Sequence, residues 1–161
     1  MSSGTQRSPL AVDVSRDDRW APYAWLALRF LGALALFSVG GVHLQQYLYL
    51  YSVIPTIGPL FLVNFAGATV LGFALLAPID RWGRAWRGLL TALVALAGVG
   101  LAAGSFIFLL ISERTPLFGF REPGYDPAAI TTSRVAEVAV VVLLAAYLVA
   151  RFVARVGVRR W

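Results

Sequence analysis

The chain has 161 residues, of which 59% are hydrophobic and only 14% are charged. A soluble domain is typically about 45–50% apolar and about 25% charged, so this sequence has too few polar side chains to cover a water-soluble globule. A lipid bilayer removes that difficulty because it solvates apolar surface. The absence of cysteine also excludes disulfides, thiolate metal ligands and a cysteine nucleophile.

Four apolar segments follow a polar N-terminal stretch, at about 25–47, 57–77, 88–111 and 132–153. Each is close to the ~20 residues that a helix needs to cross a hydrocarbon core of ~30 Å. None of them alternates apolar and polar residues as the strands of a membrane barrel do. We therefore predict an all-α fold, a four-helix transmembrane bundle over 21–161, preceded by a disordered cytoplasmic tail at 1–20.

The 14 basic residues are all arginine, and most lie in the N-terminal stretch, in the linker 78–87 and after residue 150. Because positive residues remain on the cytoplasmic side, this distribution predicts that both termini are cytoplasmic. Arginine without lysine is typical of a GC-rich bacterial genome. We expect a multi-pass protein of the bacterial cytoplasmic (inner) membrane, in which the arginines face lipid headgroups and do not bind nucleic acid.

In the third segment, residues at every fourth position form a stripe of mainly small side chains, which ends with Gly100 and Gly104. Such stripes let helix backbones approach closely in lipid. Two interpretations stay open. The stripe packs helices inside the bundle, or it binds a second copy or a larger membrane complex through Gly100 and Gly104.

The single histidine, His43, lies near the end of the first segment. At about 100° per residue, a helix places Arg29, Gly32, His43 and Tyr47 along one stripe. Lipid cannot solvate polar side chains, so we expect this stripe to face the interior of the bundle.

Two polar residues in other segments lie at a similar depth to His43. Asn64 lies about 10 Å into the second segment, and Glu137 lies about one turn into the fourth. We predict that His43, Tyr47, Asn64 and Glu137 bind a ligand in a pocket open to the extracytoplasmic side, which Gln46 and Tyr51 would also line. The ordinary alternatives are interhelical hydrogen bonds for His43 and Asn64, and an ion pair between Glu137 and Arg134.

The third linker, 112–131, is the longest connection between apolar segments. Its prolines and glycines, which include Pro127, exclude a regular helix. Connections of this length are often lids or binding loops. The alternative is an interfacial loop anchored by its aromatic residues, and both interpretations stay open.

The sequence contains no nucleotide-binding, hydrolase or metalloprotease motif, so we expect no enzyme activity. With one histidine and no cysteine, a zinc site lacks its usual ligands and a haem cannot be held by two histidines of one chain. We predict neither a metal site nor a cofactor.

The run G-x-x-H-L at 40–44, followed by I-P-T-I-G-P-L-F-L-V-N at 54–64, resembles uncharacterised four-helix membrane proteins of actinobacteria. The resemblance covers the first two segments and implies a four-helix membrane fold without a particular activity. DoxX-like proteins are similar in architecture alone, which would imply quinone or respiratory partners, but their specific motifs are absent.

The leading hypothesis is a non-enzymatic membrane protein that binds a small or lipid-like ligand, or a partner helix, in its outer half. One alternative is an accessory subunit of a larger membrane complex. Another is a small proton-coupled transporter that uses His43.

Overall fold

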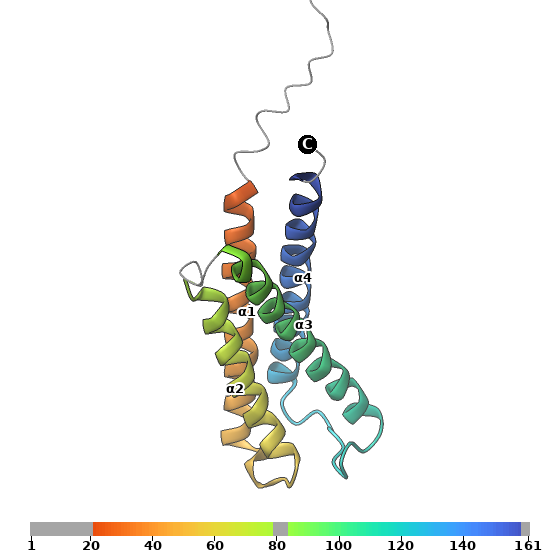
Figure 1. Cartoon of the computed structure of the whole chain (residues 1–161). Coiled ribbons are helices and arrows are strands. Elements are labelled where there is room, and N and C mark those ends of the chain that lie inside the picture. Colours follow the sequence, from red (N-terminus) through yellow and green to blue (C-terminus); the bar gives the residue numbers. More distant parts are fainter. Residues whose placement is uncertain (1–20, 79–83, 159–161) are drawn as a thin grey trace, which may run out of the picture.

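The structure, a computed structural model, describes residues 21–78 and 84–158. Those ranges contain four α-helices and one short 3₁₀ turn, which Figure 1 shows: α1 (Ala21–Tyr49), η2 (Tyr51–Val53), α2 (Ile57–Leu76), α3 (Arg84–Arg114) and α4 (Pro127–Val158). Each α-helix holds a segment long and apolar enough to cross a membrane, which confirms the predicted helical fold with four candidate spans. The tail predicted at 1–20 lies outside the described residues.

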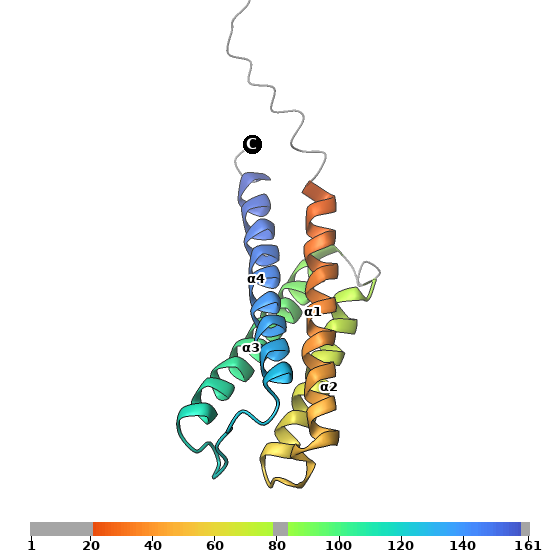
Figure 2. The ribbon, with the colours of Figure 1, turned by 180° about the vertical axis from the view of Figure 1, so that it is seen from behind.

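The two ends of the bundle differ in what they hold. The start of α1 and the end of α4 lie at one end, whereas the turn 50–56 and the loop 115–126 lie at the other, which we call the loop end (Figures 1 and 2). Helix α1 packs against α2 and α4, and α3 packs mainly against α4 and α2. In both views α3 runs obliquely across the bundle, and it diverges from α2 towards the loop end.

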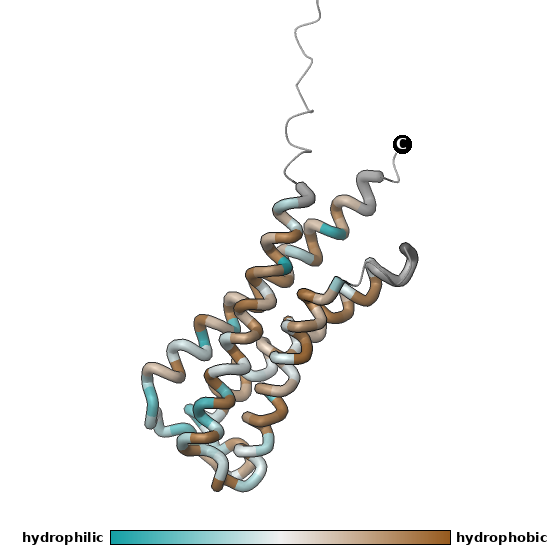
Figure 3. Tube along the Cα trace, turned by 90° about the vertical axis from the view of Figure 1, so that its left-hand side faces the viewer, coloured by the Kyte–Doolittle hydropathy of each residue, from teal (hydrophilic) through white to brown (hydrophobic). Residues whose placement is uncertain are grey.

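A continuous core of small and aliphatic side chains holds the helices together. Its fully buried members come from all four helices, with Leu36 on α1, Leu75 on α2, Ala95 on α3 and Leu144 on α4. Hydrophobic residues occur along every helix, as the colouring of Figure 3 shows, and many large apolar side chains are exposed. Large apolar side chains such as Phe73, which is 63% exposed, suit a surface solvated by lipid.

Glycines allow close helix contacts at the core around Leu144. A Cβ atom added at Gly98 would lie 2.8 Å from Leu144 Cδ1, and one added at Gly32 would also collide with the Leu144 side chain. By contrast, a Cβ atom at Gly100 or Gly104 would meet nothing within 4 Å. The structure thus shows no close helix contact at Gly100 or Gly104, and the interpretation that they bind a second copy or a larger membrane complex stays a prediction.

Arg29 has a structural role away from any pocket. Its Nη2 donates to the carbonyl oxygen of Ala77 at 2.7 Å, and its Nε donates to the carbonyl oxygen of Leu75. The last carbonyls of a helix have no partner within the helix, so Arg29 on α1 caps the C-terminus of α2.

Helix α4 begins at Pro127, five residues before the predicted start near 132. Asp126 precedes it and accepts a hydrogen bond from the backbone N–H of Ala129 at 3.0 Å through its Oδ1. This is an N-cap, and proline is favoured at the first helical position because it has no N–H to leave unpaired. The prediction that Pro127 excludes a helix was wrong for that reason, and the loop is limited to 115–126.

Candidate functional site

A cavity of about 300 Å³ lies between the four helices in the half of the bundle nearer the loop end. Apolar side chains such as Leu60, Phe61, Leu101 and Leu109 make up much of its wall. The polar residues that line it come from all four helices, η2 and the loop: His43, Gln46, Tyr51, Asn64, Ser105, Ser112, Glu122, Asp126, Ser133 and Glu137. The predicted site residues His43, Asn64 and Glu137 thus share one cavity.

Some residues that line the cavity are exposed on the outer faces of α2 and α3. Val63 on α2 lines it and is 64% exposed, and Phe108 and Gly100 on α3 line it and are also exposed. The loop side chains Leu117 and Phe120 line it at the loop end. The exposed wall residues indicate an opening between α2 and α3.

His43 is held in place by one backbone and one side-chain contact. Its Nδ1 lies 2.8 Å from the carbonyl oxygen of Val39, which can only accept, so Nδ1 carries a proton. Its Nε2 lies 3.1 Å from the hydroxyl of Ser105 on α3 and 4.0 Å from Oε1 of Glu137 on α4. His43 is 8% exposed and therefore belongs to the bundle interior, as predicted.

The Ser105 hydroxyl lies 3.1 Å from Nε2 of His43, and the same nitrogen lies 4.0 Å from Oε1 of Glu137. A hydroxyl carries one proton and donates one hydrogen bond. When Nε2 of His43 is unprotonated, Ser105 donates to it; when Nε2 is protonated, Nε2 donates to Ser105. One proton on His43 therefore reverses this hydrogen bond, close to the Glu137 carboxyl.

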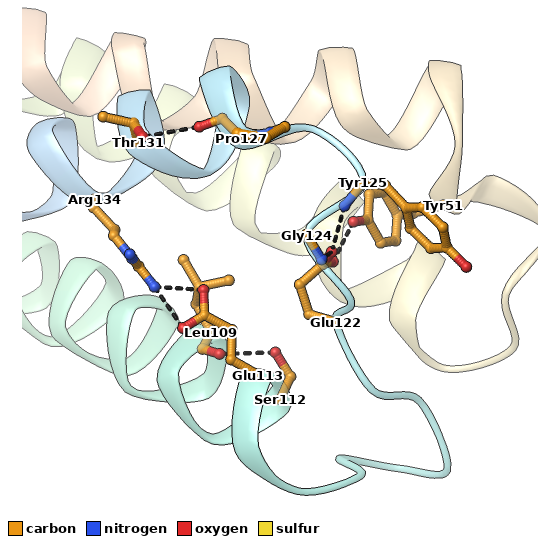
Figure 4. Close-up of polar contacts among 10 residues, drawn as sticks. All are labelled: Tyr51, Leu109, Ser112, Glu113, Glu122, Gly124, Tyr125, Pro127, Thr131 and Arg134. Atoms are coloured by element: carbon orange, nitrogen blue, oxygen red, sulfur yellow. Dashed lines mark hydrogen bonds and ion pairs between the residues drawn. The ribbon is translucent and has the colours of Figure 1, made fainter.

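Glu137 is the most deeply buried acidic side chain among the described residues, at 1% exposure. Its Oε1 accepts a hydrogen bond from the Ser133 hydroxyl at 3.2 Å. Its Oε2 is buried and has no hydrogen-bond partner. The alternative of an ion pair with Arg134 is wrong, because the Arg134 guanidinium donates to the carboxylate of Glu113 on α3 (Figure 4).

Asn64 is the polar residue that α2 contributes to the cavity lining. It is 8% exposed, it lines the cavity, and its Oδ1 is buried without a hydrogen-bond partner. Buried polar atoms are nearly always hydrogen-bonded in native proteins. Asn64 Oδ1 and Glu137 Oε2 are thus two buried oxygen atoms without hydrogen-bond partners, on residues that line the cavity.

Tyr47 is half-buried and does not line the cavity, whereas Gln46 does. On a helix, Gln46 lies about 60° to one side of His43 and Tyr47 about 40° to the other. The cavity is on the Gln46 side because that side of α1 faces α4. The choice between two neighbouring residues of one helix depends on where the next helix packs, which the sequence does not reveal.

Tyr51, the other tyrosine predicted to line the pocket, does line the cavity. Helix α1 ends at Tyr49, and the turn at η2 brings Tyr51 back under the bundle, where it is 3% exposed. Its ring stacks on Phe61 with centroids 4.6 Å apart, and it meets Phe120 edge-on at 5.7 Å. Burial raises the pKa of Tyr51, and the adjacent Glu122 raises it further.

Glu122 anchors the loop to the helices, as Figure 4 shows. Its carboxylate accepts hydrogen bonds from the Tyr51 hydroxyl and from the backbone N–H groups of Gly124 at 2.9 Å and Tyr125 at 3.3 Å. Its own N–H donates to the carbonyl oxygen of Ser112 at 2.9 Å. Sequence analysis did not single out this residue, although the E-P-G run at 122–124 is a turn signal that favours such an anchor.

Asp126 joins the first and last helices at the loop end. Its Oδ2 accepts a hydrogen bond from Nε2 of Gln46 at 2.9 Å, while its Oδ1 caps α4. The backbone N–H of Ala129 and the Gln46 amide hold the pKa of Asp126 below its usual value. The described residues contain no group of three histidine, aspartate or glutamate side chains that could hold a metal ion.

The chain matches no protein-family model, no curated protein sequence and no solved structure. The chemistry available in the cavity is therefore the basis for a functional assignment. The cavity offers an apolar wall, a His43–Ser105 hydrogen bond close to the Glu137 carboxyl, and two buried oxygen atoms without partners on residues that line it. That combination suits binding of a partly polar molecule.

Proposed function

We propose that this protein is a multi-pass protein of the bacterial cytoplasmic membrane that binds a small amphipathic ligand in its lateral cavity. The observation that carries the proposal is the coincidence of an apolar cavity of about 300 Å³ with two buried, unpaired oxygen atoms, Glu137 Oε2 and Asn64 Oδ1. Small-molecule sites in proteins are mostly apolar, with a few placed polar groups, and begin near this size. An ionisable side chain within a span is a marker of a functional site.

The orientation follows from the arginines, which lie mainly in the tail, in 78–87 and after residue 150. With those segments in the cytoplasm, the loop end is extracytoplasmic and the cavity lies in the outer half of the membrane. The exposed lining residue Val63 lies within the α2 span, so the opening faces lipid. We propose that the ligand reaches the site from the outer leaflet.

Two glycine variants test this proposal. Gly104 faces the cavity with nothing within 4 Å, so Gly104→Phe should fill the cavity without a backbone collision. Gly41 on α1 also has nothing within 4 Å, is exposed and does not line the cavity, so Gly41→Phe is a matched control.

The variants are placed in phosphatidylcholine nanodiscs and titrated in turn with decanol and decylammonium, while thermal unfolding is recorded. A ligand that binds the folded state raises the unfolding temperature in a saturable manner. We expect this rise for at least one probe in the wild type and in Gly41→Phe, and its loss in Gly104→Phe. An equal response in all three proteins, or no saturable response in any, overturns the proposal.

The second candidate function is proton-coupled transport of the ligand, which the hydrogen bond between His43 and Ser105, close to the Glu137 carboxyl, favours. A hydrogen bond that one proton reverses can link protonation to binding. Proteoliposomes with a trapped pH indicator should then acidify faster in the presence of decylammonium. Ser105→Ala should remove this effect, whereas Ser38→Ala, an exposed serine of α1 that bonds its own helix, should keep it.

A further inference from the structure

We propose that the ligand is an apolar organic cation, and that Glu137 binds its ammonium group. This inference rests on the proposed function, since it identifies the chemical class of the molecule that occupies the same cavity. It depends on four features of the cavity: its charge, its free hydrogen-bonding atoms, its aromatic wall and its opening.

The charge of the cavity is opposite to that of the protein. The chain has a formal net charge of +6, and all its basic residues apart from histidine are arginine. Yet three carboxylates line the cavity, those of Glu122, Asp126 and Glu137, and no arginine of the described ranges does. Arg29 caps α2 far from the cavity, and Arg134 pairs with Glu113. Neither arginine lines the cavity, although the charge of Arg134 also acts on Glu137.

Of the three carboxylates, Glu137 alone has an oxygen free for a ligand. Glu122 is occupied by Tyr51 and two backbone N–H groups, and Asp126 is occupied by Gln46 and the cap of α4. Glu137 is 1% exposed, and its Oε2 has no partner. A buried carboxylate without a cation is costly, and a cationic ligand would remove that cost.

The two oxygen atoms without partners on the lining residues are hydrogen-bond acceptors. They favour a ligand that donates hydrogen bonds. Glu137 Oε2 and Asn64 Oδ1 both lack a donor. The protonated nitrogen of His43 is already committed to the carbonyl of Val39. An ammonium group brings up to three donors, whereas a quinone carbonyl or a carboxylate brings only acceptors.

Aromatic side chains line the cavity together with the acidic ones. Tyr51 stacks on Phe61 at 4.6 Å and contacts Phe120 at 5.7 Å, and all three line the cavity. Aromatic faces attract cations, most strongly where water is excluded. The raised pKa of Tyr51, which burial and the carboxylates of Glu122 and Asp126 cause, reflects the same negative potential. Because the cavity opens between α2 and α3, an apolar tail can extend into the lipid.

The experiment compares three probes with the same ten-carbon chain: decylammonium, decanol and decanoate. Their saturable effect on thermal unfolding is measured in phosphatidylcholine nanodiscs at pH 7, with wild type, Glu137→Gln, Gly104→Phe and Gly41→Phe. Glu137→Gln keeps the shape of the side chain and removes its charge. Circular dichroism and gel filtration establish that each variant is folded.

We expect decylammonium to bind the wild type at least about tenfold more tightly than decanol, and decanoate to show no saturable binding. Glu137→Gln should reduce the preference for decylammonium to near unity, and Gly104→Phe should abolish binding of both. Equal affinity for decylammonium and decanol in the wild type, still lost in Gly104→Phe, overturns the cation inference but leaves the proposed function intact.

Other outcomes would overturn this inference, or the proposed function together with it. A preference for decylammonium that survives in a folded Glu137→Gln overturns the role of Glu137. Tighter binding of decanoate overturns the charge argument. Binding that Gly104→Phe does not change, or no saturable binding of any probe, overturns the proposed function together with this inference. If Glu137→Gln does not fold, the three probes on the wild type alone still decide the class of ligand.

Discussion

The core around Leu144 and the cavity use the same residue type, glycine on α3, for opposite purposes. Gly98 lies against Leu144, and a Cβ atom there would collide with the end of the Leu144 side chain. Gly104, less than two turns further along α3, faces open space at the cavity wall. In the first region a missing side chain allows close packing, and in the second it leaves room for a ligand. Six residues at about 100° each place the two glycines about 120° apart around α3, so they face different neighbours.

The core around Leu144 and the cavity also differ in polarity. The core around Leu144 consists of aliphatic and small side chains such as Leu36, Leu75 and Val140, all fully buried. The cavity instead collects a histidine, an asparagine and a glutamate, each at most 8% exposed. A region that only has to hold helices together gains nothing from buried polar groups, because each costs free energy unless it is paired. Their concentration around one cavity is the basis of the proposed binding site.

The largest expected effect is on the core. Leu144→Ala should lower the free energy of unfolding by about 2–4 kcal/mol, because Leu144 is fully buried and contacts both Gly32 and Gly98. Thermal or denaturant unfolding in nanodiscs measures the change. Phe152→Ala on the same helix is the control, since Phe152 is 69% exposed and should change stability little. Equal losses in the two variants would contradict the assignment of Leu144 to the core.

The second prediction contrasts the two glycines directly. Gly98→Leu should destabilise the protein by roughly 1–3 kcal/mol, because its Cβ would lie 2.8 Å from Leu144. Gly104→Leu should leave stability unchanged or slightly improved, because nothing lies within 4 Å and leucine favours a helix more than glycine does. Melting temperatures of both variants, recorded together, test the contrast. A loss of stability in Gly104→Leu as large as that in Gly98→Leu would mean that the cavity wall is packed.

The third prediction concerns the anchor of the loop. Tyr51→Phe removes the hydroxyl that donates to Glu122 and should weaken loop docking by roughly 1–2 kcal/mol, since a buried carboxylate loses one of its donors. Hydrogen exchange at the amides of Gly124 and Tyr125, which bond the same carboxylate, should become faster. Tyr49→Phe, at an 89% exposed position, is the control. Unchanged exchange in Tyr51→Phe would show that the loop is held by other contacts.

Tyr51 also gives a pH dependence with a defined sign. Its pKa is raised in the folded protein, so the contribution of the neutral phenol to stability is complete below the usual tyrosine pKa of about 10. That contribution is lost as the pH rises through the higher folded value. Ultraviolet titration of the phenolates should show one tyrosine fewer ionising near pH 10 in the wild type than in the denatured chain, and Tyr51→Phe should remove that difference.

The smallest expected effect is at the cap of α4. Asp126→Ala should lower the melting temperature, because it removes the acceptor for Ala129 N–H and for the Gln46 amide. Asp126→Asn keeps a side-chain oxygen that can cap α4, so it should lower the melting temperature less. The pKa of Asp126 is lowered in the folded state, so its contribution is present above the ordinary aspartate pKa of about 3.9 and is lost as the pH falls through the folded value. A fall with Asp126→Asn as large as with Asp126→Ala would contradict capping.

Part of the site could be anticipated because depth along a helix follows directly from residue number. His43, Asn64 and Glu137 were placed at similar depths from the ends of their segments, and they line one cavity. Rotation about the helix axis was less predictable. Tyr47 and Gln46 both lie within about 60° of His43, and which of them reaches the cavity depends on the position of α4.

The connections were the least predictable part. Pro127 was taken to break a helix, whereas it begins one, because proline disrupts a helix interior and suits its first turn. Tyr51 lies beyond the end of α1, and only the direction of the turn at η2 brings it under the bundle. The anchoring of the loop through Glu122 needs groups from 112 and 51, which are distant in sequence.

Composition and length were enough to establish four apolar helices, because crossing lipid imposes a length and an apolar surface that any arrangement of neighbours must satisfy. The arrangement of those helices required the tertiary structure. It decided that Gly98 packs and Gly104 does not, that Arg134 pairs with Glu113, and that Glu137 keeps a free oxygen. The physical reason is that a residue's type limits what it can contact, whereas the tilt of α3 determines what lies within reach.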